Sequence, residues 1–297
     1  MEHQELSDQL DAAVAAANRP RWLRFLRHPV RSVLPRLLGA TNKVRKLRAP
    51  TFFGTDMTVV LPEVVSTLVY RHHCYEADLS HAMIYFLKPG DTFFDVGAHF
   101  GYASLLASRL VGTTGKIVAF EPTPRTRAIL QENLAPISSA RVEPLAVWDK
   151  EADIELQDFG LQRSAWNSFT KPRAPDSRAH DFVESVKFSV RTTSIDAYVA
   201  RTGLVPSFMK IDVESAEMDV LRGADETLRK GNTIVSLEVG DYDISGIASS
   251  RALVEYLNGL GFRAYEMREG KPESHRPKER YDYQNIVFVP ASRPVAA

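Results

Sequence analysis

GDTFFDVGAHFGYASLLASRL, residues 90–110, is the stretch of the sequence that decides the fold. An apolar run beginning at Thr92 predicts a buried strand, and the apolar spacing after Gly101 predicts an amphipathic helix. Gly97 and Gly101 lie at the corner between them, where glycine lets the backbone come close to a ligand. The first turn of the helix offers free backbone N–H groups at the same corner. The stretch therefore predicts a strand, a glycine turn and a helix that together face a small molecule.

Strands and helices alternate along the rest of the chain. Parallel strands need crossover connections, and the helical patterns between the strand-like runs supply them. The last two strand-like runs, 262–269 and 283–290, have no helix between them and predict an antiparallel pair at one edge. The expected fold class is α/β, a doubly wound, Rossmann-like sheet with an antiparallel edge strand pair. The further strand-like runs are 115–121, 141–147, 207–213 and 233–239, and the further helical patterns are 124–134, 216–230 and 249–261.

Residues 148–206 form an interval too long for a simple connection. It holds two strand-like runs, 152–158 and 185–195, around a polar middle, which predicts an inserted hairpin or lid. Lids over active sites exclude water and select the substrate, so we expect the part from Trp166 to Ser168 to cover an acceptor pocket. The alternative is a surface hairpin that only covers an edge of the sheet.

An N-terminal extension, residues 1–50, precedes the main domain, which we place at residues 51–297. From Arg19 to Pro50 the chain has ten Arg and Lys residues and no acid, with apolar side chains interleaved. Such a basic segment can make peripheral contact with an anionic membrane or bind an acidic partner. The alternative is that it packs on its own domain or on a second subunit of a homo-oligomer. Three prolines argue against one long helix: Pro20, Pro29 and Pro35.

The composition is that of an ordinary globular protein of 297 residues, 44% hydrophobic and 25% charged. Its formal net charge is zero, so no global field attracts it to nucleic acid, which is not an expected partner. No run approaches the roughly 18 apolar residues of a membrane span, and the N-terminus is too acidic for a signal peptide. The one cysteine, Cys74, cannot form an internal disulfide, which favours a reducing compartment. We therefore expect a cytoplasmic protein.

Acidic side chains stand at the carboxyl ends of the expected strands, where a doubly wound sheet binds its ligand. Glu121 ends the strand-like run 115–121, a position where an acid accepts hydrogen bonds from ribose hydroxyls. The glycine turn lacks the middle glycine that admits a dinucleotide pyrophosphate, so S-adenosyl-L-methionine fits better than NAD or FAD. The alternative is a tight turn that binds no ligand. The expected cofactor-binding residues are Asp95, Gly97, Ala98, His99, Gly101, Glu121, Pro122, Ala146 and Asp212.

Six stretches follow one another along the chain: DTFFDVGAHFGYASLLAS, GKIVAFEPTPRTRAILQENL, PLAVWDKEADIEL, TTSIDAY, FMKIDVESAEMDVLRGA and IVSLEV. In this order they resemble the FkbM-type methyltransferases, a branch of the class I S-adenosylmethionine-dependent enzymes, over Phe52 to Pro290. That family usually reads KIDVEGAE, and Ser215 stands here in place of the glycine. The resemblance implies methyl transfer, commonly to a hydroxyl of a sugar or polyketide-type natural product, and hence a small-molecule or glycan acceptor. The alternatives are an N- or carboxyl-methyltransferase, a nicotinamide oxidoreductase and a non-catalytic binding protein on the same fold.

Methyl transfer to an alcohol needs a base, because the hydroxyl is a poor nucleophile until its proton is removed. His99, Asp212 and Glu238 are the expected catalytic residues, and Glu214 is a further candidate base. These three acids and Asp241 could instead hold a magnesium ion through oxygen ligands, although no metal is the expectation. Two structural alternatives are open, since Asp212 can cap the following turn and His99 can be a packed polar side chain.

Overall fold

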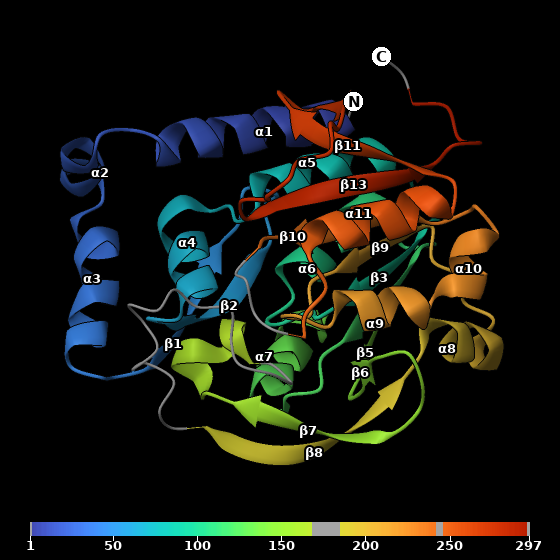
Figure 1. Cartoon of the computed structure of the whole chain (residues 1–297). Coiled ribbons are helices and arrows are strands. Elements are labelled where there is room, and N and C mark those ends of the chain that lie inside the picture. Colours follow the sequence, from blue (N-terminus) through green and yellow to red (C-terminus); the bar gives the residue numbers. More distant parts are fainter. Residues whose placement is uncertain (1, 168–184, 242–245, 296–297) are drawn as a thin grey trace.

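The alternating strands and helices build a central sheet that has helices on both faces (Figure 1). The computed structural model describes residues 2–167, 185–241 and 246–295. The sheet has eight strands, in the spatial order β12 (Lys271–Ser274), β11 (Phe262–Arg268), β13 (Gln284–Pro290), β10 (Ile234–Val239), β9 (Phe208–Ile211), β3 (Thr92–Val96), β4 (Lys116–Phe120) and β5 (Ala140–Glu143).

Strand β3 lies between β4 and β9 and pairs in parallel with both. The chain therefore winds to either side of β3, which is the switch point where such sheets bind ligands. Strand β10 continues the parallel part beside β9, whereas β13 is antiparallel to both β10 and β11. The doubly wound sheet with an antiparallel strand pair, predicted from the sequence, is confirmed.

The central strands send alternate side chains into two separate cores. Phe93 belongs to one core and its neighbour Phe94 to the other, as the two-residue repeat of a strand requires. The first core lies under α1 (Glu2–Ala17), α4 (Val64–His72), α5 (Ala77–Phe86), α6 (Tyr102–Val111) and α7 (Pro124–Leu134). The second lies under α8 (Ile195–Thr202), α9 (Glu217–Arg222), α10 (Asp225–Arg229) and α11 (Ser250–Gly259).

The predicted strand over 141–147 is in fact two strands. β5 ends at Glu143, and β6 (Ala146–Val147) pairs with a different sheet. Pro144 separates them, and proline has no N–H with which to continue a strand ladder. The sequence prediction of one continuous strand is therefore wrong at this point.

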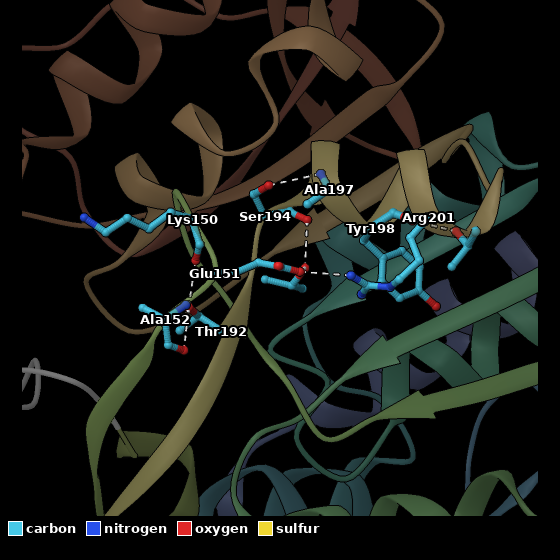
Figure 2. Close-up of polar contacts among 10 residues, drawn as sticks. Lys150, Glu151, Ala152, Thr192, Ser194, Ala197, Tyr198 and Arg201 are labelled. Carbon is cyan, nitrogen blue, oxygen red and sulfur yellow. Dashed lines mark hydrogen bonds and ion pairs between the residues drawn. The ribbon is translucent and has the colours of Figure 1, made fainter.

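The interval 148–206 contains β7 (Asp153–Asp158), a short 3₁₀ helix η1 (Leu161–Trp166) and β8 (Val186–Thr193). β7 and β8 pair antiparallel, and β6 joins β8 in parallel. Figure 2 shows how the base of this hairpin is held to the domain. The Thr192 hydroxyl donates to the carbonyl of Lys150 at 2.7 Å, and Arg201 of α8 donates to the Glu151 carboxylate at 2.9 Å. Side chain and backbone contacts therefore fix the hairpin to α8.

The N-terminal residues form α1, α2 (Arg21–Arg27), α3 (Pro29–Ala40) and β1 (Arg45–Pro50), and β1 pairs antiparallel with β2 (Asp56–Leu61). Helix α1 packs against α5, and both Leu6 and Leu10 enter the first core. Within the described ranges, no helix has the length and apolar character that crossing a bilayer requires. The first helix is thus packed on the domain.

Replacing Leu10 with Ala is expected to lower the free energy of unfolding by about 2–4 kcal/mol, because it leaves a cavity in the first core. Leu10 is 0% exposed, whereas Leu26 on α2 is 67% exposed and serves as the matched control. Leu26→Ala should change stability by less than about 0.5 kcal/mol in chemical denaturation. Equal effects of the two substitutions would show that α1 does not belong to the folded core.

Candidate active site

A cavity of about 870 Å³ opens at the carboxyl ends of β3, β4, β9 and β10. This volume falls within the range of small-molecule sites. Most of the residues selected from the sequence line it: Gly97, Ala98, His99, Glu121, Pro122, Ala146, Asp212 and Glu238. Asp95 and Gly101, also selected, are not among the described residues of its wall.

The glycine turn brings the end of β3 against the end of β9. Gly97 has a φ of 78°, and a side chain there would put its Cβ 1.8 Å from the carbonyl oxygen of Asp212. Only glycine allows both the positive φ and this close approach. Gly101 has a φ of 90°, and a Cβ there would lie 2.6 Å from a terminal methyl of the Leu130 side chain on α7. The two glycines therefore pack the turn tightly against its neighbours, and this packing shapes the wall of the cavity.

Glu121 follows β4 and fixes the loops on either side of it. Its carboxylate accepts hydrogen bonds from the backbone N–H of His99 at 3.1 Å and of Thr123 at 2.8 Å. Burial raises the pKa of Glu121 to about 7, against the opposing effect of these bonds. A carboxylate has about four acceptor positions, so Glu121 retains the capacity to accept ligand hydroxyls.

Lys210 of β9 is the buried cation of the site. Its ammonium donates to the Gly97 carbonyl at 2.6 Å and pairs with the Asp212 carboxylate at 3.0 Å. Asp95 lies 3.6 Å from the same ammonium and accepts a hydrogen bond from the Ser104 hydroxyl at 2.6 Å. Burial lowers the pKa of Lys210, but the surrounding carboxylates outweigh this and raise it above its usual value. The Asp95 carboxylate is thus a second negative partner of the Lys210 ammonium.

Three carboxylates meet above Lys210: Glu76, Asp212 and Glu238 each have an oxygen within 4.8 Å of the others. Burial raises the pKa of Asp212, but the Lys210 ammonium outweighs it, and the net pKa is below the usual value. Burial and the Asp212 charge raise the pKa of Glu76 to about 7 and that of Glu238 well above its usual value. Asp212 is therefore ionised near neutral pH, whereas Glu238 holds a proton more strongly than an ordinary carboxyl group does.

The same three oxygens could also serve a divalent cation. The set differs from the four acids suggested by the sequence, because Asp241 is used elsewhere: it accepts from the backbone N–H groups of Ser250 at 2.8 Å and Tyr281 at 2.9 Å. Lys210 already supplies a positive charge beside Asp212. A protonated carboxyl beside an ionised one also relieves the repulsion between them. The repulsion between the three carboxylates can thus be relieved in two ways, by protons shared between them or by a bound divalent cation.

His99 is held in a neutral state. Its Nε2 is 2.7 Å from the Ser164 hydroxyl of η1, and its ring lies 3.9 Å from that of Phe100 between centroids. Burial and the Lys210 ammonium lower the pKa of His99 to about 3. A group with so low a pKa is a weak base near neutral pH. In this structure His99 connects the glycine turn to η1.

Several residues around the cavity have the left-handed backbone that favours glycine. Their φ angles are 42° at Glu76, 49° at His99, 48° at Glu214 and 85° at Ser215. Such conformations cost energy and concentrate at functional sites. The angle at Ser215 explains why glycine suits this position of the KIDVES stretch.

Sequence reasoning missed three residues of this site: Glu76, Lys210 and Tyr283. The Tyr283 hydroxyl donates to the Glu238 carboxyl group at 2.5 Å. One signal was available, since a lysine within the apolar run FMKIDV needs a buried partner. Tyr283 directly precedes β13, which runs antiparallel to β10, so the start of β13 lies at the carboxyl end of β10, a relation that the local sequence does not reveal. Glu76 precedes α5 and follows no strand, and no local pattern marks it.

The inserted interval contributes η1 to the cavity wall. Ser164, Ala165 and Asn167 line the cavity, and the Asn167 amide donates to the Thr123 hydroxyl at 3.4 Å. The side chain of Trp166 and all of Ser168, expected to cover an acceptor, lie outside the described residues. The described part of the interval therefore meets the loops that flank Glu121.

Several known methyltransferases are similar to this chain in sequence. The chain is 28% identical over 178 residues to 2-O-methyltransferase NoeI of Sinorhizobium fredii. The aligned region covers 57% of this chain and 72% of that protein. It is 28% identical over 222 residues to 31-O-demethyl-FK506 methyltransferase FkbM of Streptomyces tacrolimicus, or 65% and 79% of the two chains. Hexuronic acid methyltransferase AglP of Haloferax volcanii is 27% identical over 163 residues, or 54% and 61%.

Among solved structures, the methyltransferase FkbM from Methylobacillus flagellatus aligns with a TM-score of 0.41 at 13% identity, over 75% of this chain and 54% of that one. The methyltransferase FkbM domain itself matches residues 95–264, which include the glycine turn, Glu121, Lys210 and Glu238. The match takes in more than half of the chain, and the protein therefore belongs to the FkbM family of methyltransferases.

Proposed function

We propose that this methyltransferase moves the methyl group of S-adenosyl-L-methionine to a hydroxyl group of a sugar or polyketide-type acceptor. The observation that carries the proposal is the pairing, in one cavity, of a buried acid at the nucleoside-binding position with an ionised carboxylate held by a buried lysine. The first group, Glu121, serves cofactor binding, and the second, Asp212, serves removal of the acceptor proton.

Two features of the cavity suit the cofactor. Glu121 stands at the end of β4 with acceptor positions to spare for ribose hydroxyls. Gly97, Ala98 and Pro122 line the adjoining wall, where small side chains leave room for a nucleoside. When bound, S-adenosyl-L-methionine supplies a methyl group already activated by its sulfonium. The protein then has to orient an acceptor oxygen and receive its proton.

Asp212 is the base that the charges favour. The Lys210 ammonium keeps it ionised, so it is available as a proton acceptor at neutral pH. Glu238 stands beside it, and its raised pKa favours the protonated form, which can donate a hydrogen bond within the carboxylate cluster. We assign His99 to positioning, because its low pKa and its bond to Ser164 leave it poorly suited to accept the proton.

The acceptor class rests on the relatives and on the polar part of the cavity wall. The names of the relatives specify a 2-O-methyltransferase, a hexuronic acid methyltransferase and a 31-O-demethyl-FK506 methyltransferase. Tyr75, Asp78, Tyr283 and Asn285 line the wall together with the carboxylate cluster. Such hydroxyl, amide and acid groups suit an acceptor that carries several hydroxyls.

The assignment of Glu121 is tested by Glu121→Gln, which should weaken binding of S-adenosylhomocysteine by about 1–3 kcal/mol in calorimetry, because a carboxylate acceptor is lost. Hydroxyls donate to the ionised acid, so wild-type affinity should rise as the pH increases through the pKa of about 7 and then level off. The substitution should abolish this pH dependence.

Glu143→Gln is the matched control for Glu121. Glu143 is a buried acid at the end of the neighbouring strand β5, where it accepts from the Tyr198 hydroxyl at 2.8 Å. It is absent from the described lining of the cavity. Affinity unchanged in Glu121→Gln, or lowered equally in both variants, would remove Glu121 from the cofactor site.

The assignment of Asp212 is tested by Asp212→Asn, which should lower kcat by about 10²–10⁴-fold, because proton removal contributes this much. Affinity for S-adenosylhomocysteine should stay within a few-fold. The measurement is transfer of labelled methyl to a panel of saccharide and polyketide alcohols. The control Asp241→Asn alters another strand-end acid whose carboxylate holds the loop around Ser250 and Tyr281. Full turnover of a folded Asp212→Asn protein would exclude this base, and an inactive wild type on every alcohol would contradict the acceptor class.

We also propose that η1 closes over the cofactor, since it contacts both His99 and Thr123 on either side of Glu121. Ser164→Ala removes the hydrogen bond to His99 and should weaken S-adenosylhomocysteine binding by about 1 kcal/mol. Ser250→Ala, which removes a buried hydroxyl that accepts from the Gly240 N–H, is the control. A raised KM for the acceptor with unchanged cofactor affinity would instead place η1 over the acceptor, as the sequence suggested.

A further inference from the structure

Helices α2 and α3 present an apolar surface to solvent at one edge of the molecule, beside α4 (Figure 1). Of the eleven large hydrophobic side chains that are exposed in the described residues, seven lie between Trp22 and Val44. Their spacing puts them on single faces of the helices. These side chains define the α2–α3 face: Trp22, Phe25 and Leu26 on α2, and Val30, Val33 and Leu37 on α3.

A second cavity, of about 710 Å³, adjoins this face and is strongly basic. Seven arginines and three histidines line it, and no acid is among its described lining residues. Arg71 of α4 donates to the carbonyls of Arg31 and Ser32 at 3.2 and 3.0 Å, and it forms no ion pair within the described ranges. Burial and the charges of Arg24 and Arg71 lower the pKa of His72 to about 4. Among the described residues, no carboxylate lines this basic cavity, so it suits an anionic ligand.

We propose that the α2–α3 face is a peripheral docking surface for an anionic phospholipid bilayer. The exposed apolar side chains would enter the acyl boundary of such a bilayer, and the arginines that flank them would contact the phosphate headgroups. Tryptophan is enriched at this interface, and arginine stems reach past it to the phosphates.

A second copy of the chain is a poorer occupant, because a two-fold contact would bring the arginines of one copy against those of the other. An acidic protein would balance the charge but would not by itself account for six exposed apolar side chains on adjacent helices. Helix α4 lines both cavities, with Val65 and Leu68 in the first and Arg71 in the second. A docked bilayer would thus lie one helix away from the active site.

The test is flotation of the full chain with vesicles made of equal parts phosphatidylcholine and phosphatidylglycerol. Two double variants change exposed side chains of α2. Trp22→Ser with Leu26→Ser alters the apolar α2–α3 face, and Arg21→Gln with Arg27→Gln alters the arginines beside it. Each pair should weaken vesicle binding by about tenfold or more, and added salt should weaken wild-type binding. Vesicles of phosphatidylcholine alone should bind poorly.

Matched controls alter exposed residues elsewhere: Val186→Ser with Val205→Ser, and Lys230→Gln with Arg263→Gln. These pairs should bind vesicles as the wild type does, and all variants should keep the wild-type circular dichroism spectrum. Absence of wild-type binding, equal binding to neutral vesicles, or equal losses in the controls would overturn the proposal. The proposal would also be overturned if the wild type formed a dimer that bound no vesicles and the double variant Trp22→Ser with Leu26→Ser were a monomer. That result would assign the α2–α3 face to contact between copies of the chain.

Discussion

The buried ammonium of Lys210 is the interaction on which the rest of the site depends. It joins the glycine turn after β3 to the end of β9 through the Gly97 carbonyl and the Asp212 carboxylate. A buried cation is costly unless it is paired and hydrogen-bonded, and Lys210 has both kinds of partner. The absence of a side chain at Gly97 lets these two chain segments touch. One residue thus sets the geometry of the loop and the charge of the base.

The electrostatic asymmetry of the cavity follows from that cation. Asp212 lies against Lys210, which lowers its pKa, whereas burial and the Asp212 charge raise the pKa of Glu238. Two neighbouring acids whose pKa values are shifted in opposite directions are a recurrent arrangement for proton transfer. Glu121 stands at the other side of the turn with a pKa of about 7, and we propose that it serves cofactor binding while Asp212 serves proton removal.

Much of this could be predicted from the sequence, because the decisive signals are local. Alternating strands and helices predict the sheet, and the residues at strand ends predict the location of the cavity, including Glu121 and Asp212. Pro144 was a local signal for the break between β5 and β6 that the strand prediction overlooked. The partners of Lys210 and the approach of Glu76 and Tyr283 depend on tertiary packing, which periodicity does not encode. His99 has a residue type suited to a base, but its burial beside a cation determines its pKa.

We propose that one cavity holds the nucleoside at Glu121 and directs the sulfur of the cofactor towards Asp212. A crystal structure with bound S-adenosylhomocysteine would show both contacts. We expect ribose hydroxyls bonded to the Glu121 carboxylate and the sulfur facing the side of the cavity that holds Asp212 and Glu238. A nucleoside bound away from Glu121, or a sulfur turned away from the carboxylate cluster, would contradict this proposal.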